Sequence, residues 1–184
     1  MNKSQLELIV EDIRREHLSR KIPSFHPQYG NESARFLFLL EAPGPMAVKS
    51  GFVQLDNDDQ TAKNLNEQFN EAGLCSKDIA LWNIVPWYLG NEGETKIRGA
   101  KSSDVKEALP YLDNVVKAIT NLECIVLVGS AARKAHIHLS HSTTARLLSC
   151  HHPSPKVQNT VSGAAEENIE VFRFMLALHK TNLT

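Results

Sequence analysis

Runs of apolar residues of strand length alternate along the chain with segments whose apolar residues recur at helical spacing. The apolar runs lie at residues 34–42, 79–87, 123–130 and 144–152. The helical patterns lie at about residues 4–19 and 59–72, after residue 102, and at 166–180. Because strands alternate with helices and each strand reads as apolar throughout, we expect a parallel sheet covered by helices on both faces.

Local signals indicate where the helices begin and end. Ser4 with Glu7 is typical of a capping box, and Gly73 follows the second helical pattern as a stop. Ser102 or Ser103 is expected to cap the third helix, which Pro110 interrupts. In the last helix, the residues expected to form the apolar face are Ile169, Phe172, Phe174 and Leu176.

Length and composition favour one domain in a reducing compartment. A chain of 184 residues with 42% hydrophobic content supports one sizeable core, so we expect a single domain over 1–184, with 1–30 as an N-terminal helix and lead-in. Charges are spread through the first 20 residues and no apolar run approaches membrane length, so neither a signal peptide nor an anchor is expected. The three cysteines, Cys75, Cys124 and Cys150, lie far apart, which argues against a disulfide framework, a zinc ribbon or an iron–sulfur cluster and fits the cytoplasm.

The formal net charge of −1 does not by itself indicate a nucleic-acid binder. A binding surface would have to be local, and the candidate basic groups are Lys96, Arg98 and Lys101, or Arg133 and Lys134. An ordinary solvated face is the alternative for both groups.

The unusual residues of the chain fall at the predicted carboxyl ends of the strands, where ligands bind in parallel sheets. They are "EAPGP" after the first strand, Asn83 on the second, "GSAAR" after the third and "CHHPSP" after the fourth. Pro153 and Pro155 push the residue before each of them out of the helical region, so His152 and Ser154 are expected to be extended. This convergence predicts a binding site at that edge of the sheet.

These motifs, in this order, resemble those of the uracil-DNA glycosylase superfamily over roughly residues 35–157. The resemblance implies a three-layer α/β/α sandwich with a short four-stranded parallel sheet. It also implies excision of uracil or a related deaminated base from DNA, with the base extruded into a pocket. No cofactor or metal is implied, and we expect a monomer whose partner is damaged DNA.

The resemblance also assigns roles to residues of this chain. Phe52 in "SGFVQ" is expected to stack on the base, Asn83 to read the uracil edge, and His152 to face the 2-carbonyl. The predicted DNA-binding residues are Pro43, Gly44, Gly129, Ser130, Pro153, Ser154 and Lys156. The chemistry suits these roles, because a donor at a carbonyl stabilises the charge that develops on a departing base, and a carboxamide can both accept and donate.

The first motif departs from the best-studied members, which have an aspartate where this chain has Ala42. Glu41 is therefore the candidate for positioning the attacking water. "EAPG" resembles the thermophilic iron–sulfur members, but the cysteines of that branch are missing. "PGP" is similar to the single-strand-selective and mismatch-directed branches, which brings hypoxanthine and xanthine into consideration. After "HPSP" no leucine is present to wedge into DNA, and Val157 is the nearest apolar residue.

Two other classes of function remain open. A catalytically silent member that binds a nucleobase or nucleic acid is compatible with Ala42. A metal hydrolase would use His136, His138 and His141 with Cys150 to His152, but histidines two and three residues apart on a helix converge poorly and no carboxylate completes the set.

Overall fold

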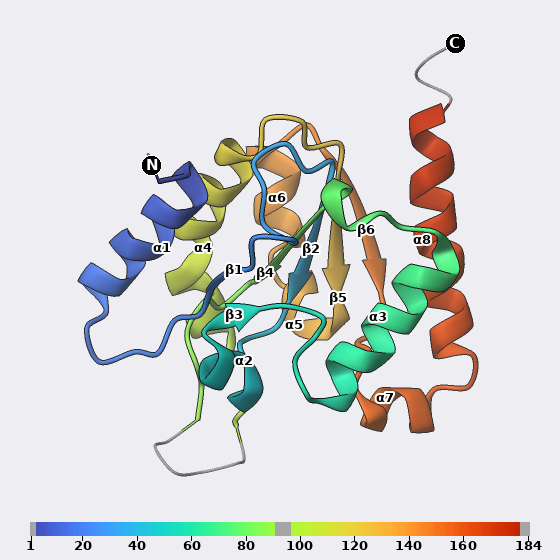
Figure 1. Ribbon diagram of the computed structural model, residues 1–184, viewed down its shortest axis with the longest axis horizontal. Helices are drawn as coiled ribbons and strands as arrows, with labels where there is room; N and C mark the ends of the chain where they lie inside the picture. The colour runs from blue at the N-terminus through green and yellow to red at the C-terminus, as the bar shows by residue number, and fades with distance from the viewer. Residues whose placement is uncertain (1–2, 91–96, 181–184) are drawn as a thin grey trace.

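A parallel sheet of four short strands forms the centre of the molecule in the computed structural model, which describes residues 3–90 and 97–180 (Figure 1). Its strands are β2 (Phe36–Leu40), β4 (Ile79–Asn83), β5 (Cys124–Val128) and β6 (Arg146–Cys150), in the order β4-β2-β5-β6. Leu40 pairs with Asn83, and Val128 pairs with Cys150. The carboxyl ends of all four strands therefore meet at one edge, as the sequence predicts.

Helices cover the sheet from both sides, so the predicted three-layer α/β/α sandwich is confirmed. The helices α1 (Gln5–Glu16) and α4 (Ser102–Ala118) pack together on one side, and α3 (Gln60–Ala72) and α8 (Ala164–Lys180) pack together on the other (Figure 1). Short helices lie in the connections between these elements: α2 (Pro45–Ser50), η1 (Ser76–Asp78), α5 (Gly129–Arg133), α6 (His136–Ser142) and α7 (Pro155–Thr160), the last of which joins β6 to α8. Within the described residues, none of the helices has both the length and the apolar character needed to cross a membrane.

The predicted ends of α1 and α3 are largely confirmed. Ser4 Oγ accepts from the Glu7 N–H at 3.1 Å, and the Glu7 carboxylate accepts from the Ser4 N–H at 2.8 Å. Helix α1 ends at Glu16, slightly before the predicted end. Gly73 closes α3 with a φ of 80°, a left-handed conformation that favours glycine.

Two predictions about α4 are wrong. Its N-cap position is Lys101, whose N–H donates to the Asp104 carboxylate at 2.7 Å, so neither serine hydroxyl caps the helix. Pro110 does not interrupt the helix. Pro110 is exposed, and Lys106 is also exposed, so the carbonyl that loses its N–H partner can be solvated while the buried face holds the helix together.

Two predicted apolar faces also differ from the structure. Strand β6 is an edge strand in which Arg146 and Ser149 are exposed and only Cys150 is buried, because it pairs with β5 alone. In α8, Ile169 and Phe172 are buried whereas Phe174 is 54% exposed. Two residues along a helix is more than half a turn, so Phe174 points away from the face that Phe172 buries.

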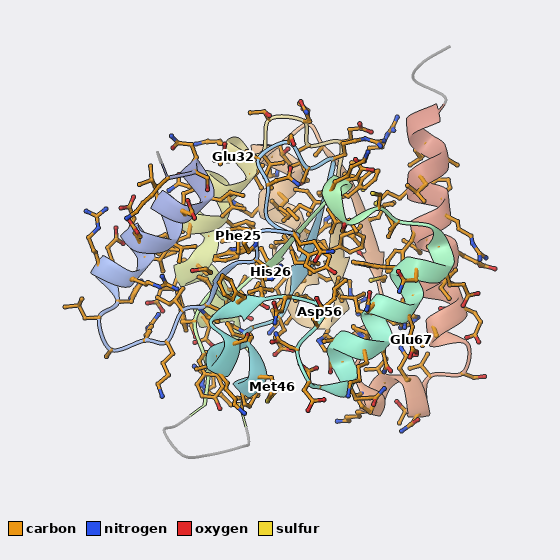
Figure 2. All side chains as sticks on the ribbon, in the orientation of Figure 1. Phe25, His26, Glu32, Met46, Asp56 and Glu67 are labelled. Carbon is orange, nitrogen blue, oxygen red and sulfur yellow. The ribbon has the colours of Figure 1, made fainter. Side chains whose placement is uncertain are left out.

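A second, two-stranded parallel sheet was not predicted. It consists of β1 (Ser24–Phe25) and β3 (Phe52–Val53), and it lies against the main sheet through Phe25, whose ring stacks on Trp82 at 4.1 Å. Figure 2 shows Phe25 and His26 beside these strands, with Met46 on the neighbouring α2. Pro45, the last residue of the "EAPGP" segment, occupies the first turn of α2, where a missing N–H costs no hydrogen bond.

Candidate functional site

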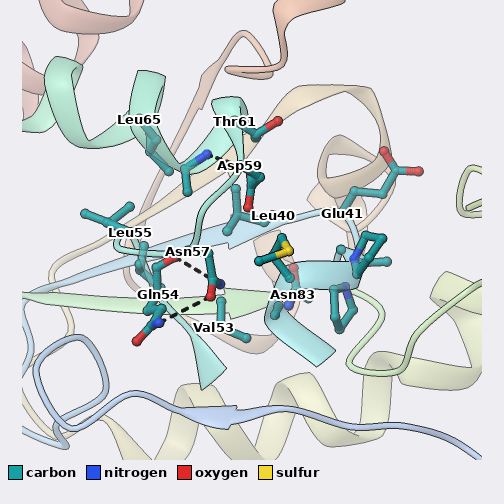
Figure 3. A pocket seen from close by; sticks show the side chains of 18 of the residues that line it. Leu40, Glu41, Val53, Gln54, Leu55, Asn57, Asp59, Thr61, Leu65 and Asn83 are labelled. Atoms are coloured by element: carbon teal, nitrogen blue, oxygen red, sulfur yellow. Dashed lines mark hydrogen bonds between the residues drawn. The ribbon is translucent and has the colours of Figure 1, made fainter. Parts of the chain in front are cut away.

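A cavity of about 310 Å³ opens at the carboxyl ends of β2 and β4. Its lining comes from residues 40–47, from parts of the segment 53–65, from Leu81 and Asn83, and from Ile97 and His152. Figure 3 shows Asn57, Asp59 and Asn83 around this space. The volume is at the small end of the range for ligand pockets, which suits a single heterocycle.

Asn83 ends β4 inside this cavity and is only 3% exposed. Within the described part of the chain, no residue is hydrogen-bonded to its carboxamide. Buried polar groups are nearly always hydrogen-bonded, so an unpartnered carboxamide at a cavity wall is suited to a ligand. It offers both an acceptor and a donor to that ligand.

His152 follows β6 and lines the same cavity. Its Nδ1 lies 3.2 Å from the Ser154 N–H, which can only donate, so the ring carries its proton on Nε2 when neutral. Burial lowers the pKa of His152 below its usual 6.5, although the carboxylates of Glu41 and Asp59 oppose the shift. Near neutral pH the cavity therefore contains a neutral imidazole with an Nε2–H donor.

The backbone around His152 holds this ring closely. Gly129 has a φ of 80°, and a Cβ there would lie 2.9 Å from the His152 Cβ, so only glycine permits the approach. The Pro153 carbonyl accepts from the Asn64 side chain at 2.8 Å. Ser154 is extended, with φ −66° and ψ 149°, as its place before Pro155 predicts, and it precedes α7.

Glu41 follows β2 and also lines the cavity. Its Oε1 accepts from the Ala100 N–H at 2.6 Å. Since its charge raises the pKa of His152, the carboxylate is close enough to act on that ring. One oxygen of Glu41 is therefore bound to the backbone, and the carboxylate is fixed beside the cavity.

Phe52, the predicted stacking residue, is not among the residues that line the cavity. Its ring packs edge-on against His26 at 5.4 Å and 90°. Side chains alternate along a strand, so the pairing of β3 with β1 directs Phe52 to His26, while Val53 reaches the cavity. The structure therefore does not place Phe52 in the cavity wall beside Asn83 and His152.

Sequence reasoning missed three polar residues of the cavity wall, Gln54, Asn57 and Asp59. Asn57 accepts from the Gln54 side chain at 3.2 Å, as Figure 3 shows. Asn57 also donates to the Phe52 carbonyl at 3.2 Å, and the two bonds tie the wall together. Asp59 caps α3 by accepting from the Ala62 N–H at 2.9 Å. An aspartate before a helical pattern signals the cap, but its approach to His152 depends on the fold.

The residues predicted to bind DNA differ in their place relative to the cavity. Pro43 and Gly44 line it. Ser130 and Lys156 are exposed on α5 and α7, the helices that follow β5 and β6, and neither lines the cavity.

The basic groups considered from the sequence have mostly local partners. The Arg98 guanidinium contacts both Asp104 oxygens, at 2.6 and 2.8 Å, and Lys134 donates to the Ala100 carbonyl at 2.6 Å. Arg133 is exposed on α5, and Lys96 lies outside the described residues.

Two of the histidines considered for a metal site contact different carboxylates. His138 Nε2 lies 2.7 Å from Asp113, and His151 Nε2 lies 2.7 Å from Glu167. His151 therefore contacts Glu167 on α8, whereas its neighbour His152 lines the cavity.

Comparisons with known proteins agree with this arrangement. A family model described as the uracil DNA glycosylase superfamily matches residues 27–175. The fold is similar to the solution NMR structure of a protein from Methanosarcina acetivorans described as a candidate uracil DNA glycosylase, with 16% sequence identity and a TM-score of 0.53. That similarity covers 84% of this chain and 98% of the other. A search of curated proteins finds no significant match.

Proposed function

The chain belongs to the uracil DNA glycosylase superfamily, and we propose that it hydrolyses the N-glycosidic bond of uracil or a related deaminated base in DNA. The observation that carries the proposal is that two groups meet in one cavity of nucleobase size. One is the buried Asn83 carboxamide, which has no hydrogen-bond partner among the described residues, and the other is the neutral imidazole donor of His152.

The proposed reaction breaks the bond between C1′ of the deoxyribose and the base nitrogen. The electron pair of that bond leaves with the base, and its negative charge spreads over the carbonyl oxygens. A water adds to C1′ and loses a proton, and the departed base gains one. The Nε2–H of His152 stabilises the developing charge by donating to the 2-carbonyl, and its lowered pKa keeps Nδ1 free to accept from Ser154.

Asn83 selects the base in this proposal. Its carboxamide accepts from the ring N–H of uracil and donates to the 4-carbonyl, whereas cytosine presents an amino group at that position. Hypoxanthine and xanthine also offer a ring N–H beside a carbonyl, so they are included in the substrate class.

Glu41 holds the attacking water in this scheme. Its Oε1 is bound to the Ala100 N–H, so its second oxygen is the one that must meet the water. Asp59 contributes a second negative charge near the cavity, which favours the positive charge that develops on the sugar. DNA would approach through the loops that carry Pro43, Gly44, Gly129, Ser130 and the 153–156 segment.

A catalytically silent, nucleobase-binding protein is the second candidate. The specific observation in its favour is that Glu41 meets a backbone donor while Ala42 occupies the place of the usual aspartate. Such a protein would retain the contacts of Asn83 and His152 without hydrolysis.

A gel assay of the wild-type protein decides between the two candidates. Labelled single- and double-stranded oligonucleotides containing uracil, hypoxanthine or xanthine are incubated with excess protein, and abasic sites are cleaved with alkali. The proposal expects excision of at least one base and none from undamaged strands. No excision from any strand, together with binding of uracil that Asn83→Ala abolishes, supports the silent protein instead.

A further inference from the structure

Ala100, in the segment at the edge of the cavity, is held by charged side chains from two directions. Its N–H donates to Glu41 Oε1 at 2.6 Å, and its carbonyl accepts from Lys134 Nζ at 2.6 Å. Glu41 follows β2, whereas Lys134 follows α5, so two strand-end loops meet at one residue of a third segment. We call residues 97–101 the rim segment, because Ile97 lines the cavity.

The rim segment has a second anchor at the start of α4. Asp104 accepts from the Arg98 guanidinium and from the Lys101 N–H, and the Arg98 contact holds the pKa of Asp104 at about 2. This anchor fixes the rim segment to α4 but does not touch Glu41. The Lys134 contact restrains the carbonyl side of Ala100, opposite the N–H that Glu41 accepts.

We propose that Lys134 is a positioning residue for Glu41, acting through Ala100. The inference rests on the proposed function, in which the second carboxylate oxygen of Glu41 holds the water. Lys134 holds the Ala100 carbonyl with a charge-assisted hydrogen bond. Because the same residue is then fixed in place, its N–H stays on Glu41 Oε1 and sets the direction of the Glu41 carboxylate.

The alternative role for Lys134 is to bind a phosphate of the DNA. The amine donates to a neutral carbonyl and keeps its positive charge, so the two roles are separated by what changes when the lysine is removed. A phosphate-binding lysine would change DNA affinity and its salt dependence when removed, whereas a positioning lysine would change the rate.

A double-mutant cycle on single-turnover excision tests this inference. Lys134→Met is expected to lower the rate by about tenfold while leaving the dissociation constant for uracil-DNA and its salt dependence unchanged. Lys134→Arg keeps a donor and is expected to restore most of the rate. In a Glu41→Gln background, Lys134→Met should cause little further loss, because both changes act on the same oxygen.

Amide hydrogen exchange of the peptide spanning the rim segment provides a readout that does not need activity. Faster exchange at Ala100 is expected in Lys134→Met and not in Lys117→Met, which removes an exposed lysine from the last turn of α4. Unchanged exchange in Lys134→Met, or fully additive rate losses, would overturn the inference. An inactive wild type would instead refute the proposed function, and the exchange measurement would still decide whether Lys134 holds Ala100.

Discussion

The two chemical walls of the cavity are fixed in different ways. The wall that bears His152 is stiffened mainly by its own motif, through two prolines and the Ser154 N–H on Nδ1, and Gly129 at the start of α5 packs against it. The wall that bears Glu41 depends on a hydrogen bond to Ala100, which is 59 residues away in sequence. The first wall is set by a motif, whereas the second is set by tertiary contacts between charged side chains and a loop.

The largest expected effect is on the locally stiffened wall. His152→Ala removes the donor to the departing base and should lower single-turnover excision by about a hundredfold to a thousandfold, with little change in product binding. His151→Ala is the matched control, because His151 contacts Glu167 and should matter much less. Equal losses in the two variants would remove His152 from its assigned role.

Asn83→Asp tests the base-reading position between the two walls. A carboxylate repels the 4-carbonyl of uracil but accepts from the amino group of cytosine, so uracil excision should fall by about a hundredfold and selectivity over cytosine should narrow. Asn114→Asp makes the same change on the exposed side of α4 and should have no effect. Rates are compared on oligonucleotides that differ only in the target base. If Asn83→Asp excises uracil at the wild-type rate, Asn83 does not contact the base.

Gly129→Ala probes the contact that seats His152. The new Cβ would meet His152 at 2.9 Å in a left-handed backbone, so both folding and excision should suffer, with a rate loss of about tenfold. Gly163→Ala imposes the same backbone strain at φ 77° with no atom within 4 Å of its Cβ, so it should lose stability alone. Thermal melts and single-turnover rates separate the two effects. If both variants excise at the wild-type rate, the contact with Gly129 does not position His152.

The smallest expected effect is a pH dependence of stability. Because the pKa of His152 is lowered in the folded state, the unfolded chain binds a proton first as the pH falls below about 6.5. The free energy of unfolding should therefore decrease below that pH, by at most about 1.4 kcal/mol per pH unit from this residue. Urea unfolding of the wild type and of His152→Gln at several pH values measures the contribution. If the free energy of unfolding changes with pH to the same extent in both proteins, His152 is not the source of the change.

Local patterns in the sequence predict the layers, the parallel sheet and the sheet edge that bears the site. The sequence predicts that Asn83 and His152 lie at this edge, because the end of a strand and a residue before proline can both be recognised from neighbouring residues. The sequence does not show that the Phe52 side chain lies outside the cavity lining, because its direction depends on the pairing of β3 with β1, which consists of two residues in each strand. The roles of Asp59 and Lys134 are not visible in the sequence, because each acts across a contact between distant segments.

The exposure of Phe174 and the continuity of α4 through Pro110 have the same origin. In both cases, the elements that pack against a helix determine which of its residues are buried. A periodic pattern in the sequence defines that buried face only approximately. Ile169 and Phe172 decide the face of α8, and the buried side of α4 tolerates a proline on its exposed side.

Single-turnover excision by Glu41→Gln tests most directly whether Glu41 activates the attacking water in this cavity. The variant keeps the size of the side chain and removes its charge. We expect a sharp loss of uracil excision with nearly unchanged binding of uracil-DNA. Excision by Glu41→Gln at the wild-type rate would contradict it.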